Sequence, residues 1–130
     1  MPTTPGKAST PGRKAAARGA AEPRLSRQRK PVDLPVDEWQ RVLRRQFGRE
    51  QPFALENLGD DPVFSEFAVF NPASRRRYRV VIRGRLPGDN HCSCPDFATN
   101  DLGTCKHVEF ALAQLTAQAG GSKALAAGFQ

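Results

Sequence analysis

The stretch CSCPDFATNDLGTCKH, residues 92–107, places three cysteines and one histidine within sixteen residues. A Cys-x-Cys pair is separated by ten residues from a Cys-x-His pair. Three thiolates and one imidazole form a set of four ligands that suits tetrahedral zinc. The spacing therefore predicts one zinc ion held by Cys92, Cys94, Cys105 and His107. Because four strong ligands fill the coordination shell, we expect a structural zinc, no catalytic residue and no enzyme activity.

The two ligand pairs require different local backbones. Residues two apart in an extended segment share a face, so Cys92 and Cys94 can both point at one ion. Residues two apart in a regular helix diverge, which places Cys105 at or just before a helix and His107 in its first turn. We expect Thr104 to be the N-cap. The partial positive charge at this helix N-terminus favours the negative charge of zinc with three thiolates.

The residues around the ligands have simpler interpretations. We expect Pro95, Phe97 and Gly103 to shape the connecting loop, with Gly103 at a positive φ. Asp96 is expected to bond loop amides or to support a ligand, and Lys106 to face solvent. His91 is interpreted as a loop histidine outside the ligand set. A redox-sensing thiol cluster, from which oxidation ejects zinc, stays open as a weaker alternative.

A hairpin and a helix surround the cysteines. Residues 64–70 and 78–82 favour strands, and Asn71-Pro72-Ala73-Ser74 between them is typical of a turn. Residues 104–119 predict a helix with one apolar stripe that packs on the hairpin. An earlier helix is expected over residues 35–47, capped by Asp33 and ended by Gly48, and a short extended piece over residues 53–55. The fold class is therefore α+β.

The charge of the chain is concentrated at its start. The 130 residues include 20 Lys and Arg against 13 Asp and Glu, a net charge of +7. Residues 1–31 hold eight basic residues and only Glu22, so they carry the whole excess. Their many Pro, Gly and Ala residues predict a disordered basic tail. Contact with nucleic acid and a merely solvated tail both stay open for this segment.

Composition also excludes some classes of protein. No run approaches the roughly 20 apolar residues of a membrane-spanning helix, and we expect no membrane partner. No apolar segment near the N-terminus resembles a secretory signal, so we expect a cytoplasmic protein, or a nuclear one if eukaryotic. The predicted organisation is a tail over 1–31, a helix and extended lead-in over 32–62, a zinc finger over 63–119 and a C-terminal tail over 120–130.

The ligand spacing and its flanking residues, 78–82, 92–97 and 102–107, together resemble the SWIM-type zinc finger. That family combines Cys-x-Cys, a variable loop and Cys-x-His on a β-β-α unit, and the resemblance covers residues 63–117. It implies the same four ligands, Cys92, Cys94, Cys105 and His107. It also implies DNA binding or protein interaction, for which an Arg-rich hairpin over residues 75–85 and the basic tail offer contacts.

Residues 92–112 are also similar to the SWIM segment near the start of bacterial helicase-like ATPases of the SWI/SNF family. The chain contains no G-x-x-x-x-G-K-S/T loop, so ATPase activity does not follow from this similarity. The alternative function is therefore a truncated or accessory N-terminal part of such a helicase-like ATPase, inactive without its motor. In that case an ATPase motor would be the protein partner.

Overall fold

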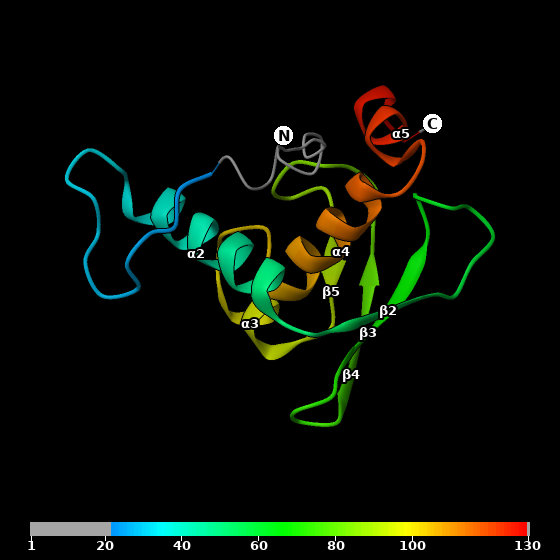
Figure 1. Cartoon of the computed structure of the whole chain (residues 1–130), viewed down its shortest axis with the longest axis horizontal. Helices are drawn as coiled ribbons and strands as arrows, with labels where there is room; N and C mark the ends of the chain where they lie inside the picture. Colours follow the sequence, from blue (N-terminus) through cyan, green and yellow to red (C-terminus); the bar gives the residue numbers. More distant parts are fainter. Residues whose placement is uncertain (1–21, 130) are drawn as a thin grey trace, which may run out of the picture.

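The computed structural model describes residues 22–129, which form an α+β fold as predicted (Figure 1). Its elements are helix α2 (Val36–Glu50), strands β2 (Ala54–Asn57), β3 (Glu66–Asn71), β4 (Arg76–Val81) and β5 (His91–Cys92), and helices α3 (Pro95–Thr99), α4 (Lys106–Ala117) and α5 (Gly121–Ala127). The predicted hairpin is thus the centre of a four-stranded sheet, larger than the expected β-β-α unit. In the described part of the chain, no helix combines the length and apolar character needed to cross a membrane.

The sheet is an antiparallel meander in the order β2-β3-β4-β5. Phe67 of β3 lies opposite Val80 of β4, and Val80 lies in turn opposite Cys92 of β5. Because side chains alternate along a strand, these three share one face with Val69. All four are buried in the main core, which α4 covers as it crosses the sheet (Figure 1). The sheet register therefore places Cys92, the first predicted metal ligand, in the core under α4.

The β3–β4 hairpin closes through the predicted Asn-Pro-Ala-Ser turn. The Asn71 side-chain oxygen accepts a hydrogen bond from the Ala73 amide at 2.9 Å, and the Asn71 carbonyl accepts one from the Arg75 amide at 2.7 Å. Arg75 has a φ of 60°, in the left-handed region. This turn projects away from the helices and from the rest of the sheet (Figure 1).

Helix α2 differs from its prediction at both ends. Pro35, not Asp33, is the N-cap, and the helix continues through Gly48 to Glu50. Gly48 lies where α2 crosses α4: a Cβ at this position would be 2.6 Å from the Lys106 carbonyl oxygen. The glycine therefore allows two helix backbones to approach closely and does not end the helix.

The sequence predicts disorder over residues 1–31, of which residues 1–21 lie outside the described part of the chain. Residues 22–31, here called the N-terminal arm, form no helix or strand but contact α2. The Leu25 amide and carbonyl both bond the Gln46 side chain, at 2.7 and 3.0 Å. The Trp39 indole donates to the Ser26 carbonyl at 2.9 Å. Polar contacts of this kind fix an arm that has little apolar surface to bury.

The predicted C-terminal tail, residues 120–130, contains helix α5. Gly120 precedes it with a φ of 77°, and Leu125 of α5 is buried in the main core. Helix α5 contacts α4, so this segment packs on the helix that carries two of the predicted metal ligands.

Candidate metal centre

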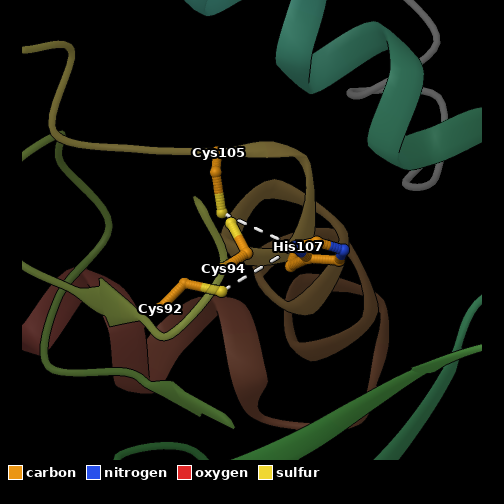
Figure 2. Close-up of side chains that lie close together, drawn as sticks. All are labelled: Cys92, Cys94, Cys105 and His107. Carbon is orange, nitrogen blue, oxygen red and sulfur yellow. Dashed lines mark hydrogen bonds between the residues drawn. The ribbon is translucent and has the colours of Figure 1, made fainter. Parts of the chain in front are cut away.

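The four predicted ligands lie together although they come from separate elements. Cys92 ends β5, Cys94 is the N-cap of α3, Cys105 is the N-cap of α4, and His107 is in the first turn of α4. Their sulfur and nitrogen ligand atoms all lie within 4.8 Å of one another. Figure 2 shows the three thiols gathered beside the imidazole ring.

The spacing of these atoms fits one small ion between them. The His107 Nδ1 atom is 3.8 Å from Cys92 Sγ and 3.9 Å from Cys105 Sγ. In a tetrahedral zinc site, Zn–S bonds of about 2.3 Å and Zn–N bonds of about 2.0–2.1 Å separate sulfur and nitrogen by about 3.6 Å. The cluster therefore has the donor types of a zinc site and nearly its size, and the ring presents Nδ1 to it.

Burial makes the thiolate forms of this cluster costly unless a cation compensates their charge. The exposed fractions are 1% for Cys92, 2% for Cys94, 0% for Cys105 and 2% for His107. Hydrogen bonds from Cys105 and then Cys92 hold the pKa of Cys94 well below its usual range. Cys92, Cys94 and burial together raise the pKa of Cys105. A bound divalent cation would favour the thiolate form of all three cysteines.

The backbone around Cys92 and Cys94 is held at several points. The Phe97 amide donates to Cys94 Sγ at 3.4 Å. Ser93, between the two cysteines, exchanges two hydrogen bonds of 3.0 Å with the Arg79 backbone of β4. These bonds fasten the Cys-x-Cys segment to the sheet edge and aim both sulfurs inward, as the alternation of an extended chain predicts.

Cys105 lies just before α4 and His107 in its first turn, as predicted, but the N-cap residue is Cys105 and not Thr104. Cys105 itself has the extended backbone of an N-cap, at φ −155°. Thr104, predicted as the N-cap, instead donates its hydroxyl to the Glu109 carboxylate at 2.6 Å. Burial raises the pKa of Glu109. Gly103 has the expected positive φ, 76°, and sits against the Gly88 backbone.

Helix α2 supports the loop between the ligand pairs, a role that the sequence did not reveal. Arg44 donates to both carboxylate oxygens of Asp96 at 2.9 Å, and Arg41 donates to the Leu102 carbonyl at 3.0 Å. The Arg44 guanidinium holds the pKa of Asp96 below its usual range. Asp96 therefore bonds a distant arginine and not the loop amides. Helical periodicity placed both arginines opposite the apolar stripe but indicated no partner for them.

The two histidines of the chain have different surroundings. The His107 ring packs against Tyr78 and Phe53, with centroids 4.7 and 5.3 Å away, and its buried Nε2 has no hydrogen-bond partner among the described residues. His91 is exposed, packs against Phe97 and lies outside the cluster, as expected.

Lys106 differs from its prediction. It is half-buried, with its ammonium 5.5 Å from the centre of the Phe47 ring, and is not simply solvent-facing. A cation over an aromatic face is an attractive contact, so this lysine adds to the packing of α2 on α4.

Taken together, the residues form a buried cluster of three cysteines and one histidine that could bind one metal ion and is compatible with a zinc finger. Comparisons with protein-family models, with curated proteins and with solved structures found no match to this chain.

Proposed function

We propose that this chain is a non-catalytic, SWIM-type binding module whose fold depends on one structural zinc ion and whose partner is a nucleic acid. The observation that carries the metal part is the buried set of four soft ligand atoms within 4.8 Å. Four protein ligands leave no coordination position for a substrate. The carboxylates nearest in sequence are already engaged, Asp96 by Arg44 and Glu109 by Thr104.

A structural role for the metal agrees with the energetics of small domains. Natural domains are stable by only about 5–15 kcal/mol. Structural zinc contributes an apparent 10–16 kcal/mol in finger peptides near neutral pH, about the same amount. Cys92 and Cys94 would tie the edge of the sheet, through such an ion, to the start of α4 at Cys105 and His107. Removing the ion should release both attachments together.

The nucleic-acid part of the proposal rests on charge. The chain carries +7, and residues 1–31 hold the excess. Arginines in the β3–β4 hairpin add exposed cationic groups. Lysine and arginine contacts to phosphates release counterions, so the binding should weaken steeply with salt and depend little on base sequence.

Elemental analysis tests the metal part. We expect one tightly held zinc per chain in the wild type, and loss or weakening of that zinc in Cys105→Ser and His107→Ala. His91→Ala is the matched control, because this exposed histidine lies outside the cluster. Chelation should also lower the helical circular dichroism of the wild type. An absence of zinc in freshly reduced protein would remove this part of the proposal.

Salt-dependent binding to duplex DNA tests the second part. We expect affinity to fall by a similar factor for unrelated duplex sequences when salt is raised. An affinity that does not change with salt would contradict phosphate contacts.

A further inference from the structure

We propose that the turn of the β3–β4 hairpin, residues 71–77 and hereafter the hairpin tip, enters a groove of duplex nucleic acid and contacts its phosphates through Arg75 and Arg76. This inference rests on the proposed nucleic-acid function and assigns it to one element. It is argued from the partners of the arginines, from the backbone of the tip and from its shape.

The arginines of α2 already have partners within the fold. Arg44 bonds Asp96, while Arg45 and Arg49 bond Glu22 of the N-terminal arm at 2.7–3.1 Å. Their side chains are only about a fifth to a third exposed. Moving them to a phosphate would break contacts that hold the metal-site loop and the arm.

The hairpin arginines divide into paired and unpaired groups. Arg77 pairs with Glu56 and Arg79 with Glu66, each at 3.3 Å across the sheet. Arg83 stacks on the Phe129 ring, and Arg85, in the loop between β4 and β5, is exposed and forms no ion pair among the described residues. Arg75 and Arg76 are exposed and form no ion pair with any residue of the described range 22–129. The tip therefore presents two adjacent guanidinium groups that the fold itself does not use.

The backbone conformation of Arg75 is one that glycine would adopt more readily than arginine. Its φ of 60° lies in the region that glycine adopts without cost and that other residues seldom occupy. Asn71 holds this conformation through its bonds to Ala73 and Arg75. An arginine in a position suited to glycine points to a use for its side chain outside the fold.

The shape of the tip favours a groove over a flat acidic surface. Strand β2 pairs with β3 only as far as Phe70, and β5 pairs with β4 only at Val80 and Val81. Beyond these points the end of the hairpin is two-stranded, and its turn projects from the body of the molecule (Figure 1). Arg75 and Arg76 lie next to each other at the end of this ribbon, whereas Arg77 is held by Glu56. The major groove of B-DNA, about 12 Å wide, admits a two-stranded ribbon and has phosphates along both walls.

The test compares two double variants of the full chain that lose the same charge. Arg75→Gly with Arg76→Gln removes the tip cations, and the glycine suits the left-handed backbone. Arg27→Gln with Arg29→Gln removes two exposed cations of the N-terminal arm. Melting temperature and zinc content verify that each variant folds. Binding to a short labelled duplex is then measured by fluorescence anisotropy across a salt series.

Two lost phosphate contacts should reduce the slope of log affinity against log salt by about 1.8. Between about 50 and 200 mM salt, the wild type should therefore lose about twelvefold more affinity than the tip variant does. The arm variant should retain a steeper salt dependence than the tip variant.

Several results would overturn the inference, and they differ from failure of the proposed function. If the wild type binds duplex with a strong salt dependence and the tip variant binds equally well, the tip is not the contact. If the arm variant loses as much affinity and as much salt dependence as the tip variant, the arm contributes equally and the assignment of binding to one element fails. If polyglutamate binds as tightly as duplex and depends on the tip, the tip recognises acidic protein. If the wild type binds no duplex at low salt, the nucleic-acid function itself fails.

Discussion

Replacing Gly48 by alanine separates intrinsic helix preference from the packing of α2 on α4. Alanine is favoured over glycine within a helix by about 1 kcal/mol, so preference alone predicts a more stable protein. The structure predicts the opposite sign, because the new Cβ would lie 2.6 Å from the Lys106 carbonyl oxygen and 3.0 Å from the Phe110 amide nitrogen. Both are backbone atoms that cannot rotate away.

The size of the effect follows from these two opposing contributions. Overpacking a well-packed contact costs about 1–3 kcal/mol, and a 2.6 Å approach to backbone belongs in the upper part of that range. After the gain of about 1 kcal/mol from helix preference, we expect Gly48→Ala to lower the free energy of unfolding by about 1–2 kcal/mol. Lys106 lies between Cys105 and His107, so the displaced backbone carries two of the proposed ligands. If metal binding is coupled to folding, each 1.4 kcal/mol weakens zinc affinity about tenfold.

Urea unfolding of the zinc-loaded protein and competition with a chromophoric chelator measure the two effects. Gln114→Ala, at an exposed position of α4, is the control for a favourable change to alanine without a steric conflict. A Gly48→Ala protein at least as stable as the wild type, with unchanged zinc affinity, would refute the argument from close helix packing.

Two further predictions concern polar contacts made by α2. Asp96→Asn should reduce stability by about 1 kcal/mol, because it removes the negative charge and one of the two oxygens that accept hydrogen bonds from Arg44. Asp101→Asn, at an exposed position, should change little, and urea unfolding compares the two variants. The hydrogen bond from Arg45 lowers the pKa of Glu22 from its ordinary value of 4.5. The contact between the arm and α2 should therefore be fully formed above pH 4.5 and be lost as the pH falls through the lowered pKa. Fluorescence of Trp39, the single tryptophan, should report this transition because its indole bonds the arm, and Glu22→Gln should abolish it.

The sequence predicted those features that depend on local patterns. The strand pair and its Asn-Pro-Ala-Ser turn follow from alternation and turn chemistry, and both appear in β3 and β4. The apolar stripe of α4 follows from helical periodicity and reaches the sheet as expected. The proximity of Cys92, Cys94, Cys105 and His107 follows from their spacing, because each pair needs only its own short backbone segment to point inward.

Short elements and tertiary contacts were not predictable in the same way. Strand β5 has two residues and α3 has five, too few to display a period of 2 or of 3.6. Both form because neighbours hold them: β5 pairs with β4, and α3 begins at Cys94 and is bound by Arg44. The prediction that Gly48 ends α2 was wrong, because the sequence does not distinguish a glycine that ends a helix from one that permits two helices to cross closely.

Helix α2 connects the N-terminal arm, the loop between the ligand pairs and helix α4 through residues on two successive turns. Arg44 holds the metal-site loop at Asp96, and the next residue, Arg45, holds the arm at Glu22. One turn further on, Gly48 sets the distance to the helix that carries Cys105 and His107. A displacement of α2 would therefore reach the loop, the ligands and the arm together. The proposed metal would join the edge of the sheet at Cys92 to the start of α4 at Cys105 and His107, in the middle of this assembly. The hairpin tip lies away from it (Figure 1).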